Sequence, residues 1–199
     1  DPYLPAVEDG RLYGLGSNDA GGCLVALVAV FLYYYDRQDL KYNVVLAATA
    51  EEEISGTGGI ELTLPHLPAI DCAIVGEPTQ MQMAVAERGL MVLDCTSHGK
   101  AGHAARNEGE NAIYKALKDI EWFKTYQFDK VTPLLGPSKM TVTVVETENK
   151  AHNVVPAVCR FVVDTRINEL YTFEEVTEII RSHVACEIKQ RSTRLRSIS

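Results

Sequence analysis

The chain has 199 residues, of which 46% are hydrophobic, and a formal net charge of −8 at pH 7. This apolar fraction can supply a folded core and excludes a disordered chain. An acidic chain without a Lys/Arg cluster predicts no nucleic-acid partner and no anionic membrane. Residues 23–35 form the longest apolar run, which is shorter than the roughly 20 residues that cross a bilayer. Five scattered cysteines are typical of reduced side chains, so we expect a cytoplasmic protein.

Residues 1–86 have the pattern of an α/β layer. Residues 21–37 are apolar nearly all round, which predicts a buried helix. Residues 43–50 and 72–75 are continuous apolar runs, which predict strands buried on both faces, as in a parallel sheet covered by helices. We therefore expect the first domain to cover residues 1–86.

Residues 87–199 have a different pattern, in which apolar and polar residues alternate. Four segments predict strands of an antiparallel sheet with one covered face: residues 89–97, 140–145, 160–166 and 186–190. In the second of these, Met140, Val142 and Val144 should share one face. Two amphipathic helices fit between the strands, and the second should begin with a capping box of Thr172 and Glu175. The order βαββαβ predicts a ferredoxin-like domain.

Acidic side chains stand at the ends of the predicted buried elements of the first domain. Asp19 precedes the helix, Glu51, Glu52 and Glu53 follow the strand at residues 43–50, and Glu77 follows the strand at residues 72–75. Ligands of open α/β sheets gather at the carboxyl ends of strands, and a divalent cation relieves the repulsion between converging carboxylates.

Each acidic position also has an alternative interpretation. Asp19 could cap the helix. The run of three glutamates could be the acidic first turn of a helix, and Glu77 could lie in an exposed turn before Pro78. The occurrence of all three at successive element ends favours a joint functional role.

Three motifs in order carry a resemblance to a known family: GLGSND at residues 14–19, TAEEE at residues 49–53 and VGEPT at residues 75–79. Together they resemble the M20 family of metallopeptidases and deacylases, in particular its branch of acetylornithine deacetylases and succinyl-diaminopimelate desuccinylases. The resemblance covers essentially the whole chain. It implies part of a zinc-peptidase-like catalytic domain followed by a ferredoxin-like lid, or dimerisation, domain at residues 87–199.

The resemblance implies a role for each acidic residue. Asp19 matches the carboxylate that bridges two zinc ions, Glu53 matches a ligand of one zinc, and Glu77 matches a ligand of the other. Glu52 matches the general base that accepts the proton of a metal-activated water. The family usually has Asp where this chain has Glu51. The implied cofactor is two Zn²⁺ ions, with Co²⁺ as an alternative, since carboxylate-rich sites discriminate poorly between such metals.

Further matches lie in the second domain. His103, in the stretch HGKAGHA at residues 98–104, matches a histidine that enters the active site of the partner subunit and stabilises the oxyanion, which implies a homodimer formed through the lid. Asn153 matches a substrate-binding residue, and Arg166 matches a residue that grips the substrate carboxylate. Without the resemblance, His103 would be a surface-loop histidine and Arg166 a member of a surface ion pair.

Two histidine ligands that the family requires are not found in this chain. One belongs to an His-x-Asp motif before the position of Asp19, and the other lies near the carboxyl terminus of the family. The five histidines here are in neither motif. Since the chain begins with Asp1 and Pro2, we expect it to be part of a longer protein. Alone it should hold little or no zinc and have little activity.

The resemblance predicts a zinc-dependent amidohydrolase that acts on a small N-acyl amino acid: N-acetylornithine, N-succinylornithine or N-succinyl-diaminopimelate. Two alternatives remain open. One is a non-catalytic dimerisation or peptide-binding module, and the other is a metallo-dipeptidase on the same scaffold. The presence of both missing histidines in the flanking sequence would favour an enzyme over the module.

Overall fold

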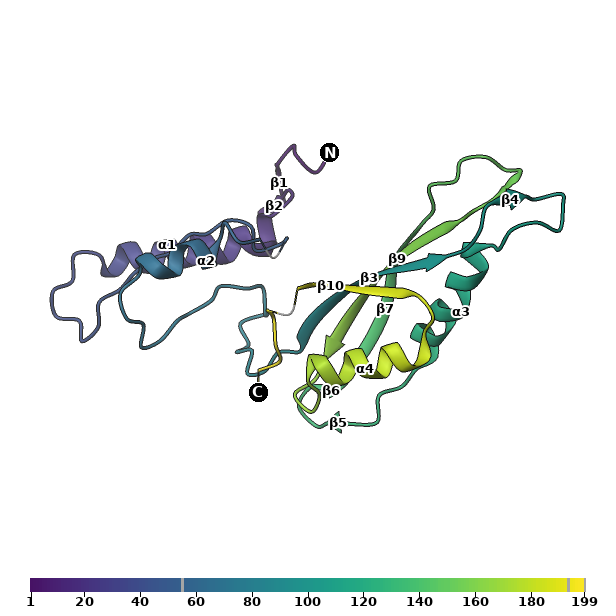
Figure 1. Ribbon diagram of the computed structural model, residues 1–199. Helices are drawn as coiled ribbons and strands as arrows, with labels where there is room; N and C mark the ends of the chain where they lie inside the picture. The colour runs from purple at the N-terminus through teal and green to yellow at the C-terminus, as the bar shows by residue number, and fades with distance from the viewer. Residues whose placement is uncertain (55, 193, 199) are drawn as a thin grey trace. The chain divides into compact units, whose positions relative to one another are not determined.

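The computed structural model describes residues 1–54, 56–192 and 194–198. The chain divides into two compact units, Asp1–Met83 (unit 1) and Ala84–Ser199 (unit 2) (Figure 1). The domain border that the sequence predicts between residues 86 and 87 stays a prediction for the complete protein.

Unit 1 begins with a short hairpin. Strands β1 (Ala6–Glu8) and β2 (Arg11–Tyr13) pair antiparallel. They are joined by Asp9 and Gly10, whose φ angles of 49° and 74° are those of a tight hairpin turn. A π-helical segment, Ser17–Gly22, leads into helix α1 (Cys23–Tyr34), which confirms the helix expected at residues 21–37. Two short turns of helix follow later: α2 (Ile60–Thr63) and the 3₁₀ segment Leu64–His66.

Unit 1 differs from the prediction in two ways. Residues 43–50 and 72–75 form no strand, and no parallel pair occurs among the described residues. Helix α1 was expected to be buried, but none of its residues is; Leu32, for example, is 64% exposed. The two differences have one physical cause. A strand buried on both faces needs hydrogen-bonded neighbours, and the described part of unit 1 supplies no such sheet to pair with these residues or to cover α1.

Helix α1 and the π-helical segment before it form one apolar stretch. Residues Ser17–Tyr34 have a mean hydropathy of 1.3. By length and composition alone, this stretch is long and apolar enough to cross a membrane. The sequence pattern had predicted no such run. The backbone leaves helical geometry at Asp19 and Ala20, however, so the regular helix has only 12 residues. At 1.5 Å per residue it is about 18 Å long, shorter than the roughly 30 Å of a bilayer core.

Unit 2 contains the predicted ferredoxin-like fold. Its antiparallel sheet has the order β10-β3-β9-β7. The strands are β3 (Gly89–His98), β7 (Lys139–Glu146), β9 (Val158–Ile167) and β10 (Glu187–Ser192). Helix α3 (Ala112–Thr125) connects β3 to β7, and helix α4 (Phe173–His183) connects β9 to β10. Two short antiparallel strand pairs lie in the loops of unit 2. Strand β4 (Gly102–His103) pairs with β8 (Val154–Val155), and β5 (Val131–Thr132) pairs with β6 (Gly136–Pro137).

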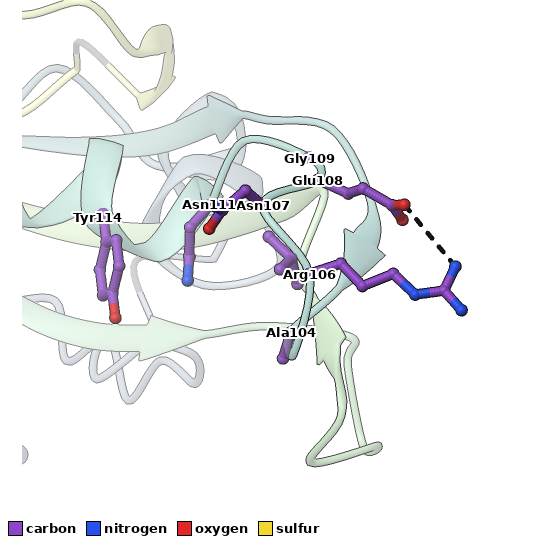
Figure 2. Close-up of a pocket in the computed structure, with 8 residues that line it drawn as sticks. Ala104, Arg106, Asn107, Glu108, Gly109, Asn111 and Tyr114 are labelled. Atoms are coloured by element: carbon purple, nitrogen blue, oxygen red, sulfur yellow. Dashed lines mark ion pairs between the residues drawn. The ribbon is translucent and has the colours of Figure 1, made fainter.

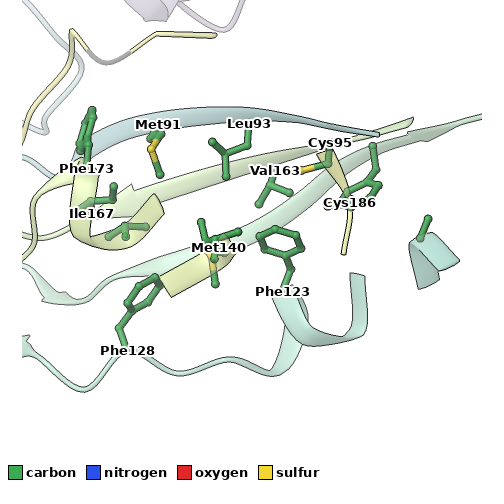
Figure 3. Close-up of a cluster of buried hydrophobic side chains, with 14 of the residues drawn as sticks. Met91, Leu93, Cys95, Phe123, Phe128, Met140, Val163, Ile167, Phe173 and Cys186 are labelled. Atoms are coloured by element: carbon green, nitrogen blue, oxygen red, sulfur yellow. The ribbon is translucent and has the colours of Figure 1, made fainter. Parts of the chain in front are cut away.

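The core of unit 2 lies between the sheet and its two helices (Figure 3). Alternate residues of β3, namely Met91, Leu93 and Cys95, are at most 1% exposed and face this layer. Helix α4 begins with the expected capping box, in which Thr172 Oγ1 accepts the N–H of Glu175 and the Glu175 carboxylate accepts the N–H of Thr172. Within the described residues of unit 2, no helix covers the other face of the sheet, which we call the open face.

One expectation for β7 is wrong. Met140 and Val142 face the core as predicted, but the register shifts between Val142 and Val144. The extra residue at this bulge turns Val144 toward the open face, where it is half-exposed beside Val162. Strict alternation cannot anticipate an inserted residue, because a bulge changes the face of every residue after it.

Candidate functional site

Asp19 lies where the backbone bends before helix α1. Its φ and ψ are −107° and 103°, outside the helical region, and the peptide bond that joins it to Ala20 is cis. The side chain is exposed. The residue in the N-cap position of α1 is Gly22, and no side chain caps the helix. The interpretation of Asp19 as a simple helix cap is therefore wrong.

The three consecutive glutamates have different environments. Glu51 has a positive φ of 62°, and its carboxylate accepts the backbone N–H of Gly58 at 2.7 Å. It thus closes the loop that follows. Glu52 and Glu53 are exposed in a turn. The next helix begins only at Ile60, so these residues are not the first turn of a helix. Glu51 is held by the loop, whereas the carboxylates of Glu52 and Glu53 face solvent.

Glu77 is exposed and precedes a tight turn. Its carbonyl oxygen accepts the N–H of Thr79 at 2.8 Å, and the hydroxyl of Thr79 donates to the carbonyl of Gln82. This is the exposed-turn environment that the sequence left open as an alternative. It leaves the carboxylate accessible and does not exclude a role as a metal ligand.

The carboxylates of unit 1 do not form a metal site as they stand. Among the described residues, no group of three or more His, Cys, Asp or Glu is placed to hold a metal ion. Asp19, Glu53 and Glu77 were expected to converge at the ends of paired parallel strands, and those strands are not formed here. A set of three carboxylates also lacks the imidazole nitrogen that usually completes a zinc site. The residues present therefore do not fit a zinc centre by themselves.

His103 is held in one orientation by its own loop. It is exposed in β4, and its Nδ1 accepts the backbone N–H of Ala105 at 3.2 Å. The N–H of Arg106 donates to the carbonyl of His103 at 2.9 Å and closes the same turn. Because Nδ1 is the acceptor, the proton of the neutral ring is on Nε2. The ring thus presents an N–H donor on the side away from its backbone.

Asn153 lies next to His103. Its carbonyl oxygen accepts the N–H of Ala104 at 2.9 Å, and the neighbouring Val154 pairs with His103 between β8 and β4. The side chain of Asn149 secures this loop by donating to the carbonyl of Val154 at 2.7 Å. Of the residues that the sequence predicts for substrate contact, His103 and Asn153 are thus brought together.

Arg166 lies on the open face of β9 and is about half exposed. Its guanidinium donates to both oxygens of Asp164, from Nε at 2.8 Å and from Nη2 at 3.1 Å. This bidentate pair raises the pKa of Arg166, and burial opposes the shift more weakly. The same fork geometry suits a substrate carboxylate. Asp164 had no role in the sequence prediction, although its two-residue spacing from Arg166 placed both on one face of a strand.

Arg166 and the pair of His103 and Asn153 lie at opposite ends of the sheet. Arg166 pairs with Leu90 near the start of β3, whereas Val158, at the other end of β9, pairs with the last residue of β3. The distance along β9 from Val158 to Arg166 is about 26 Å, at about 3.3 Å per residue. Strand β4, which pairs with β8, lies beyond the end of β3 (Figure 1).

A hollow of about 490 Å³ opens beside His103 in the loop before helix α3. Eight residues line it: Ala104, Arg106, Asn107, Glu108, Gly109, Asn111, Tyr114 and Val155. Figure 2 shows the side chain of Arg106 turned outward to Glu108, with which it forms an ion pair at 3.7 Å. The hollow is lined mainly by this loop, and Asn111 caps helix α3 next to it by accepting the N–H of Ile113.

Comparison with known proteins identifies the class of this fold. Residues 85–191 match the family model described as the peptidase dimerisation domain of the M20 group. Because this match covers more than half of the chain, the chain belongs to the M20 family. The family resemblance and the fold class expected from the sequence are thus confirmed.

Several curated relatives resemble the chain along most of its length. Succinyl-diaminopimelate desuccinylase 2 of Ruegeria sp. (strain TM1040) is 29% identical over 92% of this chain and 49% of its own length. The succinyl-diaminopimelate desuccinylase of Parvibaculum lavamentivorans is 31% identical over 86% of this chain and 46% of its own length. The chain therefore spans about half the length of the curated relatives it matches.

A solved structure shares the fold of both units. The structure of a tripeptidase from Staphylococcus aureus subsp. aureus mu50 aligns with a TM-score of 0.62 and 20% identity, covering 98% of this chain and 55% of that one. At this identity the similarity concerns the fold alone.

Proposed function

We propose that the complete protein is a metal-dependent amidohydrolase that removes a succinyl group from an N-succinyl amino acid. The observation that carries this proposal is the similarity, over most of the chain, to relatives named as succinyl-diaminopimelate desuccinylases. The motifs around Asp19, Glu52 and Glu77 support it, because they resemble the motifs that contain the catalytic carboxylates of the family. N-succinyl-diaminopimelate and N-succinylornithine are the candidate substrates, and N-acetylornithine is the competing one.

The carboxylates of unit 1 have separate proposed roles. Asp19, Glu53 and Glu77 would hold two Zn²⁺ ions together with histidines that this chain does not contribute. The metal supplies an acidified water when it is bound. Glu52, which is exposed beside Glu53, would serve as the general base that moves a proton from this water to the leaving amine. Glu51 has no proposed role in this site, and its carboxylate accepts the backbone N–H of Gly58.

His103 is the proposed donor to the oxyanion. The hydrogen bond from Ala105 to Nδ1 supports this role, because it leaves Nε2–H as a donor that needs no rearrangement before reaction. Asn153, on the loop paired with His103, would contact the same substrate. Arg166 would bind a substrate carboxylate after exchanging its internal partner Asp164 for it.

The positions of these residues favour a dimer. His103 and Arg166 lie at opposite ends of one sheet, too far apart to contact one small substrate. For a substrate bound by Arg166 of one subunit, His103 of another subunit would therefore complete the binding site. This arrangement agrees with the match to a dimerisation domain.

The two edges of the sheet of unit 2 differ in a way that suggests where the subunits meet. Edge strand β10 is highly charged, with the sequence EIKQRS, which protects an edge against pairing. Edge strand β7, with the sequence KMTVTVVE, has no charge between its ends, and Val145 is 55% exposed. Helix α3, which packs beside β7, exposes Tyr114 and Leu117. We propose β7 and α3 as the surface that a second copy covers.

The test is amine release by the full-length protein from N-succinyl-diaminopimelate, N-succinylornithine and N-acetylornithine, with added zinc and with chelator. Zinc-dependent release that is fastest from a succinylated substrate supports the proposal. Faster release from N-acetylornithine would assign the acetyl group instead. Release from dipeptides alone would assign a dipeptidase, and no release with any of these would leave a non-catalytic module. Glu52→Gln should abolish release without loss of folding, because the side chain is exposed.

A further inference from the structure

Cations on the open face of the sheet generally stand opposite carboxylates. Lys189 on β10 is the register partner of Asp94 on β3, and Asp94 also accepts a hydrogen bond from Arg191 at 2.8 Å. Arg160 on β9 is the register partner of Glu146 on β7. Such pairs contribute to sheet stability, whereas like charges directly opposite one another destabilise it.

The exception is at the end of the sheet where Arg166 lies. The register partner of Arg166 on β7 is Lys139, so that two cations face one another across neighbouring strands. Arg166 is paired with Asp164. Lys139 is exposed and forms no ion pair with any of the described residues. Of these two cations, only Arg166 is thus bonded to a carboxylate, that of Asp164.

Neighbouring charged residues do not remove the imbalance. The charge of Glu87 is the weakest of the causes that raise the pKa of Arg166, and it acts without a hydrogen bond. The carboxylate of Glu87 forms no ion pair among the described residues. Arg88 adds a third cation nearby, and its guanidinium donates to the carbonyl of Leu135 rather than to a carboxylate. This corner of the sheet therefore keeps a cation without an anionic partner.

We propose that Lys139 is a second carboxylate-binding residue beside Arg166, and that the site is built for an N-acyl amino acid with two carboxylates. Cβ atoms of directly opposite residues are about 4.5–5.5 Å apart, so the Arg166 fork and the flexible Lys139 ammonium can each hold one carboxylate of the same small molecule. An N-succinyl amino acid has a carboxylate on each side of its amide bond. This inference rests on the proposed function, in which Arg166 binds substrate.

The kinetic test uses two substrates that differ by one carboxylate, N-succinylornithine and N-acetylornithine. In the full-length protein, Lys139→Gln should raise KM for the succinyl substrate by at least about tenfold, because loss of a charge-assisted hydrogen bond weakens binding by about this factor. Its kcat and the KM for the acetyl substrate should stay within about twofold of wild type. Equal increases of KM for both substrates, or no increase for either, would overturn the proposal.

Two variants serve as controls. Lys139→Arg keeps the charge and should retain most of the affinity for the succinyl substrate. Lys189→Gln makes the same change on the same face, at a position opposite Asp94, and should leave KM for both substrates unchanged.

A binding measurement separates this inference from the proposed function. Calorimetry of the full-length protein with succinate, and with butyrate as the monocarboxylate control, does not require turnover. A loss of succinate affinity in Lys139→Gln, with butyrate unaffected, supports the dicarboxylate site even if wild type hydrolyses neither amide, in which case only the proposed function fails. Equal succinate affinity in wild type and variant overturns the inference, whatever the activity.

Discussion

The imidazole of His103 accepts a hydrogen bond at Nδ1 from the backbone N–H of Ala105, only two residues further along the chain. This short-range contact fixes the tautomer of the ring without help from any other element. A donor that is already oriented stabilises developing negative charge more effectively than one that must first reorient.

Replacing His103 should therefore affect catalysis and not folding. His103→Ala is expected to lower kcat of the full-length protein by about 100- to 1000-fold, as removal of an oxyanion donor does elsewhere. Its side chain is exposed, so the thermal midpoint should not move. His98→Ala is the matched control, since the exposed ring of His98 lies 3.3 Å from the Glu187 carboxylate on the surface of the sheet. Unchanged turnover in His103→Ala would remove this residue from the mechanism.

The proposed dimer edge predicts that a charge on β7 separates the subunits. Val145→Lys places an ammonium group on an uncharged, exposed edge strand and should convert a dimer into a monomer in analytical ultracentrifugation. Because His103 would then be unable to reach a second subunit, activity should fall in parallel. Ile188→Lys on the opposite edge strand β10 is not a suitable control because Ile188 packs against the core. Glu187→Lys is suitable, because Glu187 is exposed on β10 and its register partner Thr96 carries no charge. A dimer that survives Val145→Lys would place the interface elsewhere.

Unit 2 was predictable from sequence because its signals are local. The alternation in β3 and β9 and the capping box of Thr172 and Glu175 reflect contacts within one domain, and all of them occur in the structure. The bulge after Val142 was missed because the sequence does not mark an inserted residue.

The metal site of unit 1 could not be predicted to the same degree. Residues 43–50 have the composition of a buried strand, but a strand forms only with a hydrogen-bonded neighbour, and the described residues supply none. Convergence of Asp19, Glu53 and Glu77 depends on that sheet. The motifs therefore indicated the family, whereas the predicted metal site depends on a sheet that the described residues do not form.

Substitution of Asn168 should lower the stability of the fold strongly. Asn168 is 0% exposed, and its side chain donates to the carbonyls of Lys130 and Gly136 and accepts the N–H of Leu170. Asn168→Ala leaves these backbone groups without their partners and should lower the free energy of unfolding by about 3 kcal/mol. Asn107→Ala in an exposed loop should change it by less than about 0.5 kcal/mol. Urea denaturation followed by circular dichroism measures both, and equal effects would contradict this role for Asn168.

The pair of Asp94 and Arg191 predicts a contribution to stability that depends on pH. The hydrogen bonds from Arg191 lower the pKa of Asp94 in the folded state. A lowered carboxyl pKa stabilises the fold above the unfolded-state pKa, and this stabilisation is lost as the pH falls through the folded-state value. Since both side chains are about half exposed, the effect should be below about 1 kcal/mol. Between about pH 7 and about pH 3, the free energy of unfolding should fall less in Asp94→Asn than in wild type. An identical fall in both would show that this pair does not contribute to the pH dependence of stability.

The donor set of unit 1 predicts weak metal binding by a polypeptide limited to residues 1–199. Asp19, Glu53 and Glu77 provide carboxylates only, and no described group of three ligands is assembled. Without imidazole ligands, and with the carboxylates exposed to water, zinc should dissociate during dialysis, and added zinc should not restore hydrolysis of N-succinylornithine. Metal analysis after dialysis, with Asp19→Asn as the control, measures this directly. Two zinc ions retained per chain and lost in Asp19→Asn would show that these carboxylates form a tight site without histidine.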